Sequence, residues 1–411
     1  MKKRRTLRLS VLASAVTVAA GLVPAAASAQ ENPIKVGVVL ELSGRLSLYG
    51  EAGRRGIDMA TATFGDTAIG GRKVEFVYKD VQSDTQLVIT ALNELTNVDR
   101  VNFIIGPCAS PLISAGTPAW QQKKPIWMQF CGIAPRLREA VGDEDNFFHT
   151  FPWAYHYHQS VSEALASYLG KGKKAVVVYS DDDFGRGHID PIKKYYAAAG
   201  IEIVGAEAVR VGTTDFNPLL TKFARLNPDM LIAMVEGGDL VSLAKQLYAR
   251  KFKAYLVGSG AVQFDAFANA VGPEIQEGWI GPTTYIPGVH RPADANYPKL
   301  LPAAQDWEDA FRKRYNRDPN LIDVGSYVTT AMLLIAMERA GGDDLEKVRA
   351  ELTRLNVSTP LGAGQFTKSE DGTKHQAFAK MVTFQRQGGR PIVIYPSDVA
   401  EGKLVPPSFG R

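Results

Sequence analysis

Cysteine is scarce in this 411-residue chain, which contains only Cys108 and Cys131. Two cysteines allow a single disulfide at most, so no disulfide framework holds the fold and buried apolar cores must do so. Large basic clusters are also missing, because after Arg8 no run of Lys and Arg is longer than three residues. A nucleic-acid-binding protein needs such a cluster, and we therefore expect no nucleic-acid partner.

Sequence signatures of catalysis are absent as well. The chain has no G-x-S-x-G, H-E-x-x-H or P-loop motif. Gly50, Gly53 and Gly56 open a helical stretch, but their spacing is not that of the dinucleotide-binding fingerprint. His156 and His158 are two positions apart, so on a helix they point to different sides and make a poor metal pair. We expect no enzyme, no metal and no cofactor.

The N-terminus is typical of a secretory signal peptide. Five cations lie within the first eight residues, an apolar stretch covers residues 11–23, and Ala27-Ser28-Ala29 forms a small-x-small cleavage site. A membrane anchor is the alternative, but the apolar stretch is short and no later stretch approaches eighteen apolar residues. We predict a signal peptide over 1–29, cleavage after Ala29 and a soluble periplasmic protein. Without its five leader cations, the formal net charge falls from +4 to −1.

Short apolar runs alternate with helical periods between Ile34 and about Tyr285. Most of the runs are continuously apolar, as expected for parallel strands covered on both faces. A clear amphipathic stripe follows Asp215, a candidate N-cap, with apolar residues at helical spacing from Phe216 to Ala224. The alternation predicts an α/β fold of two Rossmann-like lobes with mostly parallel sheets. The expected strands cover 34–40, 74–78, 101–105, 126–128, 175–179, 201–204, 230–234, 255–257 and 279–280.

Breaks in this rhythm predict where the chain changes lobe. The first break lies around 147–153, and a loop rich in Gly and Pro over 281–298 is the expected return. Two long helical stretches follow, over 302–315 and 322–339, and the tail after Leu361 is expected to form a hairpin at a sheet edge. We therefore assign 33–151 and 284–358 to lobe 1, and 152–283 and 359–411 to lobe 2, joined by a multi-strand hinge.

Five segments carry a resemblance to a known family. They are IKVGVVLELSGRLSLYGEAGRRGIDMA (34–60), FIIGPCAS (103–110), PIWMQFCGIAPRL (125–137), VVVYSDDDFGRG (176–187) and TDFNPLLTKFARLNPDMLI (214–232). In order and spacing they resemble the branched-chain amino-acid-binding family of type I periplasmic binding proteins. The resemblance implies a monomeric solute-binding protein that closes its lobes on a small ligand and delivers it to the permease and ATPase subunits of an ABC importer. A sensor protein of the same fold that feeds a separate receptor is the alternative.

The resemblance also implies a ligand pocket at the carboxyl ends of the strands. In lobe 1, Tyr49 stands where the family places an aromatic residue over the ligand, although packing beside the first helix explains it equally well. Ser110 is the expected hydroxyl donor to a ligand carboxylate, or else a helix cap. Gly132 and Ile133 occupy the next loop, and Ile133 replaces a Thr that is common in amino-acid-binding relatives.

In lobe 2, Phe184 matches an aromatic residue that closes over the ligand. Glu236 ends a strand and is a candidate contact for an ammonium or hydroxyl group, with a surface salt bridge as the alternative. Many relatives carry their acid near the position of Gly260, where this chain has none. Three aromatic residues lie just past the first crossing: Trp153, Tyr155 and Tyr157. They are candidates for stacking on an aromatic ligand, Tyr155 first among them, although packing under the hinge explains them equally well.

Two questions stay open at this point. The ligand is a leucine-, isoleucine- or valine-type amino acid, or an aromatic or other small carboxylate. Cys108 and Cys131 are expected at the ends of neighbouring parallel strands, near enough for a disulfide, which needs Cα atoms within about 7 Å. Relatives instead pair the Cys108 position with one near Gln82.

Overall fold

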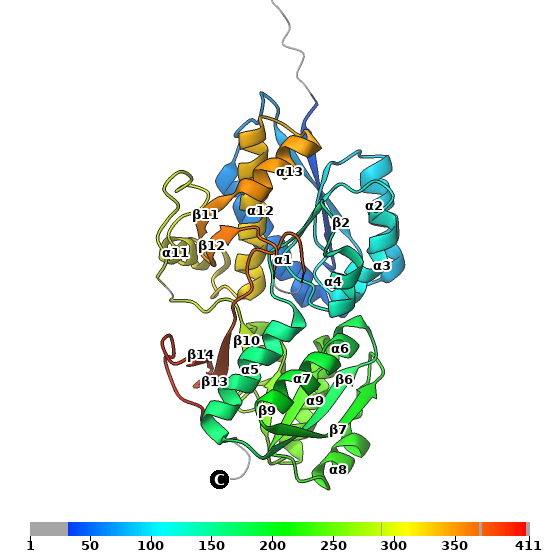
Figure 1. Ribbon diagram of the computed structural model, residues 1–411, viewed down its shortest axis with the longest axis vertical. Coiled ribbons are helices and arrows are strands. Elements are labelled where there is room, and N and C mark those ends of the chain that lie inside the picture. The colour runs from blue at the N-terminus through cyan, green and yellow to red at the C-terminus, as the bar shows by residue number, and fades with distance from the viewer. Residues whose placement is uncertain (1–31, 289, 370–371, 408–411) are drawn as a thin grey trace, which may run out of the picture. The chain divides into compact units, whose positions relative to one another are not determined.

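Two mostly parallel sheets organise the chain, and the computed structural model describes residues 32–288, 290–369 and 372–407 (Figure 1). The predicted leader and its cleavage site lie outside these residues. The first sheet has the order β2-β1-β3-β4-β5 and is parallel throughout. Its strands are β1 (Ile34–Leu40), β2 (Val74–Asp80), β3 (Phe103–Ile105), β4 (Ile126–Gln129) and β5 (Phe147–His149). All residues of β3, β4 and β5 are buried, which explains their uninterrupted apolar character.

Helices cover both faces of the first sheet because its connections run in two directions. The step from β1 to β2 goes one way along the sheet and the later steps go the other way, so right-handed crossovers place α1 opposite α2 and α3 (Figure 1). Helix α12 packs along α1. We call the first sheet with these helices lobe 1. Its helices are α1 (Ser47–Phe64), α2 (Thr85–Asn97), α3 (Ser110–Trp120), α4 (Pro135–Val141), α11 (Ala304–Tyr315), α12 (Leu321–Ala340) and α13 (Leu345–Arg354).

The second sheet has the order β14-β13-β10-β9-β8-β6-β7 and forms the centre of lobe 2. It is parallel from β7 to β10, and an antiparallel hairpin of β13 and β14 extends its edge beside β10. Its strands are β6 (Lys173–Ser180), β7 (Ile201–Val209), β8 (Met230–Met234), β9 (Tyr255–Gly258), β10 (Ile280–Thr283), β13 (Val382–Gln387) and β14 (Arg390–Tyr395). Its helices are α5 (Ala154–Leu169), α6 (Asp183–Gly187), α7 (Ile189–Ala198), α8 (Asn217–Ala224), α9 (Gly237–Ala249), α10 (Asp265–Val271) and the 3-10 turn η1 (Gly260–Gln263).

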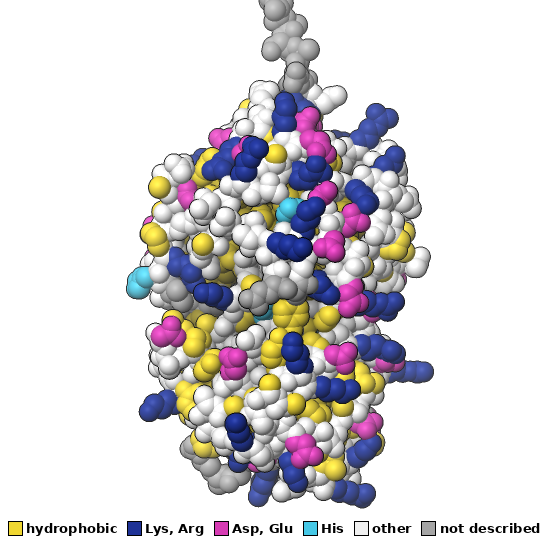
Figure 2. Space-filling view, viewed as in Figure 1, with side chains coloured by type: hydrophobic (Ala, Val, Ile, Leu, Met, Phe, Trp, Pro, Cys, Tyr) yellow, Lys and Arg dark blue, Asp and Glu magenta, His cyan; other side chains and the backbone are white. Residues whose placement is uncertain are grey.

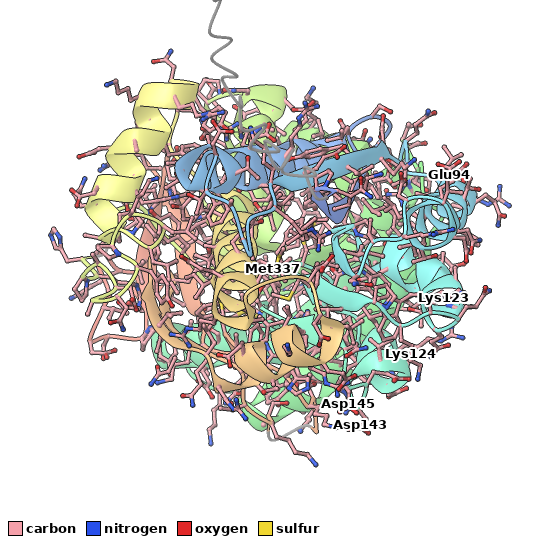
Figure 3. All side chains as sticks on the ribbon, turned by 90° about the horizontal axis from the view of Figure 1, so that it is seen from above. Glu94, Lys123, Lys124, Asp143, Asp145 and Met337 are labelled. Carbon is pink, nitrogen blue, oxygen red and sulfur yellow. A yellow bond between two sulfur atoms is a disulfide. The ribbon has the colours of Figure 1, made fainter. Side chains whose placement is uncertain are left out.

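Helix α12 is the one helix of the described residues that is long and apolar enough, by length and composition, to cross a membrane, although polar residues interrupt its apolar run. An 18-residue window of this 20-residue helix has a mean hydropathy of 1.4. Of that window, however, 94% is buried inside the fold, and the helix forms the centre of the lobe 1 core. Figure 3 shows Met337 of this helix in the interior, whereas Glu94, Lys123, Lys124, Asp143 and Asp145 lie at the periphery.

Three further details differ from the sequence expectations. Residues 147–149 form strand β5 where we expected only a break in the rhythm. Asp215 does not cap α8, whose N-cap residue is Phe216; the Asp215 carboxylate accepts from the Asn217 amide instead, because the helix starts later than predicted. The last change of lobe also comes later than residue 359. Strand β12 (Gly362–Gln365) pairs with β11 (Asn356–Thr359), and Gln376 bridges to His149 of β5.

Candidate functional site

A cavity of ≈ 40 Å³ lies where loops from the carboxyl ends of both sheets meet. A single water needs roughly 10–15 Å³ of such space, so the cavity is narrow, with room for about three waters. The lobe 1 wall comes from the loops after β1, β3 and β4, and the lobe 2 wall from those after β6, β8 and β9. The order of each sheet reverses at β1/β3 and at β6/β8, the points at which open α/β sheets bind ligands.

The cavity contains seven of the eight residues selected from the sequence. They are Tyr49, Ser110, Gly132, Ile133, Phe184, Glu236 and Gly260. The eighth, Tyr155, does not line this cavity and lies instead in a surface groove between α4 and α7. Tyr157 lines the cavity in its place, because residues two apart on helix α5 differ in direction by about 200°.

The lobe 1 wall is tied together by a hydroxyl and a disulfide. Ser110 Oγ accepts from the backbone N–H groups of Ile133 at 3.0 Å and Ala134 at 3.3 Å. Ser110 therefore does not act as the N-cap of α3, a position held by Ala109, and instead links the β3–α3 and β4–α4 loops. Cys108 and Cys131 form a disulfide between the same two loops, with their Cα atoms 4.7 Å apart. Both cysteines line the cavity.

The lobe 2 wall contributes an acid that faces the cavity with an unused oxygen. Glu236 is 8% exposed, and its Oε2 is buried without a hydrogen-bond partner. Burial raises the pKa of Glu236 to about 8, and repulsion by Asp182 adds to this. Arg45 and a hydrogen bond from Tyr49 favour the ionised form only partly. A cation or a hydrogen-bond donor would therefore satisfy Glu236 Oε2.

The rest of the lining is strongly aromatic and carries no positive side chain. Among the described residues, no Lys, Arg or His lines the cavity, and Glu236 is its one acid. The Tyr49 ring packs edge-on against Phe264 of lobe 2, with centroids 5.7 Å apart. Phe184 packs against His188, which is wholly buried behind it. Positive potential for an anionic group must therefore come from helix N-termini such as that of α3.

Several lining residues were missed by the sequence analysis. Ser259 and Phe264 follow β9, and the rule that strand ends face the cleft would have found them. Leu321 and Ile322 begin helix α12, which enters from lobe 1 after the chain has crossed back. Nothing local marks these two apolar residues as different from the rest of a core helix.

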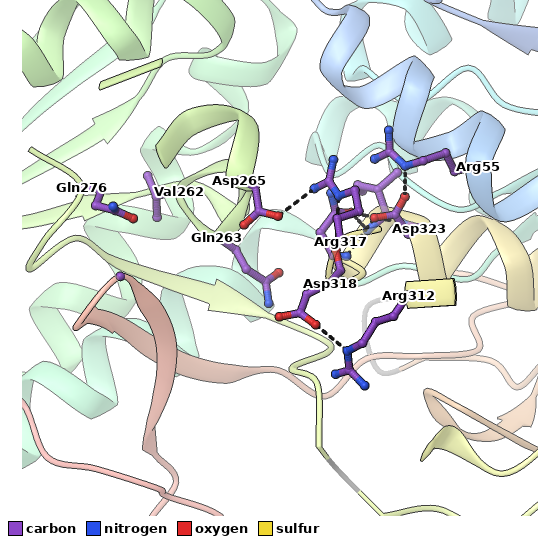
Figure 4. A network of polar contacts seen from close by, with 12 residues as sticks. Arg55, Val262, Gln263, Asp265, Gln276, Arg312, Arg317, Asp318 and Asp323 are labelled. Carbon is purple, nitrogen blue, oxygen red and sulfur yellow. Dashed lines mark hydrogen bonds and ion pairs between the residues drawn. The ribbon is translucent and has the colours of Figure 1, made fainter. Parts of the chain in front are cut away.

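Ion pairs connect the two lobes around the cavity. Arg45 in the β1–α1 loop lies 3.6 Å from Asp182, and Arg136 in α4 lies 3.7 Å from Asp183. These two acids directly precede Phe184. Figure 4 shows a third pair, Arg317 with Asp265 at 3.4 Å, close to the Arg55–Asp323 and Arg312–Asp318 pairs of lobe 1. The lobes are thus in contact through charged groups of several elements, and Figure 2 shows that acidic and basic side chains are interspersed over one face of the molecule.

Comparisons with known proteins agree with this architecture. A family model described as periplasmic binding protein matches residues 33–390, and the chain belongs to this family. The Leu/Ile/Val-binding protein homolog 7 of Brucella abortus is 22% identical over 402 residues, covering 95% of this chain and 97% of that protein. The leucine-, isoleucine-, valine-, threonine- and alanine-binding protein of Pseudomonas aeruginosa is 24% identical over 379 residues, covering 90% and 94%.

Solved structures show the same fold. The leucine-binding protein LivK of Thermotoga maritima aligns with a TM-score of 0.77 and 21% identity, covering 89% of this chain and all of that one. A solute-binding protein of an ABC transporter from R. palustris, in complex with benzoate, aligns with a TM-score of 0.74 and 21% identity, covering 88% and 95%. The predicted type I periplasmic binding protein fold is therefore confirmed.

Proposed function

We propose that this chain is the periplasmic solute-binding component of an ABC importer and captures a small carboxylate-bearing molecule without transforming it. The observation that carries the proposal is the interlobe cavity, whose described lining holds one buried, unpartnered carboxyl oxygen, that of Glu236. Its partners are a membrane permease with ATPase subunits, and its lobes close and open about the connecting strands. A sensor role would use the same binding step but a different partner.

The first candidate ligand is an α-amino acid. Its ammonium group would satisfy Glu236 Oε2, and the ion pair would offset the cost of ionising a buried acid. Its carboxylate would lie at the N-terminus of α3, near the Ser110 hydroxyl. A curated relative from Pseudomonas aeruginosa is named for binding leucine, isoleucine, valine, threonine and alanine, which supports this class.

The second candidate is a small aromatic acid. The rings of Tyr49, Tyr157, Phe184 and Phe264 around a small cavity favour it, since aromatic pairs gain stacking energy beyond buried area. A structural neighbour from R. palustris was solved with benzoate. In this case the protonated Glu236 would donate to a ring hydroxyl or to the ligand carboxylate.

Isothermal titration calorimetry distinguishes these candidates. We would titrate the protein with L-leucine, L-isoleucine, L-valine, L-phenylalanine, benzoate and 4-hydroxybenzoate, and recover each ligand for mass analysis. Binding of one class, with unchanged ligand, supports the proposal. Turnover of the ligand contradicts the non-enzymatic role, and no binding by any of the six contradicts both ligand classes.

The predicted processing has its own test. Mass spectrometry of the periplasmic protein should give a monomeric chain that starts at Gln30. An intact leader or a chain confined to membranes would overturn this localisation. Limited proteolysis with and without ligand tests the proposed lobes, 33–151 with 284–358 and 152–283 with 359–411.

A further inference from the structure

Glu41 is a buried acid next to the cavity that takes no part in lining it. It follows the last residue of β1, and its side chain is fully buried. No Lys or Arg of the described residues forms an ion pair with it, whereas buried carboxylates are normally paired. Gly50 of α1 packs on its backbone so closely that a Cβ there would lie 2.2 Å from the Glu41 carbonyl oxygen.

The partners of the Glu41 carboxyl group are backbone amides of the cavity wall. Its Oε1 accepts from Ala109 N at 3.0 Å, and its Oε2 accepts from Cys108 N at 3.3 Å. Both amides lie just before α3, so the group uses both of its oxygens on one loop, as an anion does at a helix N-terminus. Cys108, Ala109 and Ser110 all line the cavity.

We infer that Glu41 is a positioning residue for ligand capture. Its carboxylate fixes the β3–α3 loop, and Ser110 in turn fixes the β4–α4 loop. The second link is the pair of bonds that Ser110 Oγ accepts from Ile133 and Ala134. Two of the loops that form the lobe 1 wall are therefore held from behind by one carboxylate. The inference rests on the proposed function, since it concerns binding in that cavity.

The charges that face Glu41 make this support dependent on pH. Burial raises the pKa of Glu41 to about 7, the backbone amides oppose the rise, and Asp80 at the end of β2 adds repulsion. Glu236 is the other acid within electrostatic reach. Ionised Glu41 has two free oxygens that accept from the two amides. Protonated Glu41 carries a proton on one of these oxygens, which is then a weaker acceptor. The support is therefore complete above this pKa and is lost as the pH falls through it.

Hydrogen–deuterium exchange tests the first link without any ligand. At pH 8 the Glu41→Gln variant should lower the protection factors of the Cys108 and Ala109 backbone amides about tenfold or more. The reason is that the glutamine side chain has one oxygen and one NH₂ group, so one of the two backbone N–H groups loses its acceptor. The matched control is Asp294→Asn. Asp294 is 5% exposed and accepts from Asn296 N and Tyr297 N in a loop that does not line the cavity. Unchanged protection in Glu41→Gln overturns the inference.

Calorimetry with L-leucine, L-phenylalanine and benzoate tests the second link. The ratio of Kd between Glu41→Gln and the wild type should be about 10 to 100 at pH 8 and should approach one at pH 5.5, where wild-type Glu41 is protonated. A purely structural loss would not depend on pH in this way, and Asp294→Asn should give a ratio near one at both values. A ratio near one at pH 8, or one independent of pH, contradicts the positioning role. If the wild type binds none of the three ligands, the proposed ligand classes are contradicted. The exchange experiment alone then tests whether Glu41 orders the loop.

Discussion

Glu236 is the residue whose chemistry best separates the two ligand classes. In the ligand-free protein its pKa is raised to about 8, so between the unperturbed carboxyl value of 4.5 and 8 the folded state holds a proton that the unfolded state lacks. Its contribution therefore lowers stability as the pH rises through this range. The ammonium group of an amino-acid ligand would stabilise ionised Glu236, so binding should release the proton that Glu236 holds. At pH 6.5 we expect amino-acid binding to release about one proton per ligand, measured by calorimetry in buffers of different ionisation enthalpy.

The Glu236→Gln variant gives the same residue a second test. If the ligand is an amino acid, loss of one partner of a buried charge pair should weaken binding by roughly 2–5 kcal/mol and abolish the proton release. If the ligand is an aromatic acid, the change should be mild, while Phe184→Ala and Tyr49→Ala weaken binding. No effect in any of the three variants would mean that ligand does not bind in this cavity.

Residue roles were predictable from the sequence only where the backbone pattern fixed them. Phe184 follows strand β6 and Glu236 follows strand β8 of the same mostly parallel sheet. The sequence pattern therefore predicted that both residues lie at the carboxyl edge of that sheet. The side on which an α5 residue falls depends on where that helix starts, which is why Tyr157 and not Tyr155 reaches the cavity. Glu41 follows β1 just as Glu236 follows β8, but its role was missed, because its partners are backbone amides of a distant loop that the sequence pattern does not reveal.

At the scale of elements, the Cys108–Cys131 disulfide joins two loops of one cavity wall. It closes a loop with a sequence separation of 23, for which chain entropy gives about 3 kcal/mol of stabilisation. The Cys108→Ala/Cys131→Ala double variant should lose about this much free energy of unfolding in urea. It should also bind ligand more weakly, because the loops that carry Ser110 and Ile133 are less ordered. Unreduced, denatured wild type with two reactive thiols would contradict the bond, and a variant of wild-type stability would contradict its role.

Strands and long helices followed from the sequence because their apolar periods are strong. The parallel core strands are almost uninterrupted apolar runs, and α11 and α12 begin and end within two residues of the expected ranges. Strand β5 is only three residues long, and its edge position depends on pairing with β4, so no local pattern separates it from a crossing segment. The β11–β12 pairing joins residues through a tight turn against α12, and tertiary contacts decide it.

The whole molecule is expected to open and close, and the ion pairs that cross between its lobes should set the rate. Arg45 and Asp182 lie 3.6 Å apart with about a third and a seventh of their side chains exposed, respectively. Pairs of this kind contribute roughly 0–1 kcal/mol and are screened by salt. We therefore expect Arg45→Glu, which turns attraction into repulsion, to raise the ligand dissociation rate about threefold to tenfold in low salt, measured by stopped-flow fluorescence.

Two comparisons make this prediction specific to lobe closure. The Arg45→Glu/Asp182→Arg variant restores an opposite-charge pair and should recover most of the wild-type rate. Arg54→Glu is the matched control, because its partner Asp58 lies on the same helix and spans no lobe boundary. Small-angle scattering should show that ligand makes the wild type more compact and that Arg45→Glu needs more ligand to reach the same state. A dissociation rate that is equal in all four proteins, or a scattering profile unchanged at saturation, would show that these pairs do not control closure.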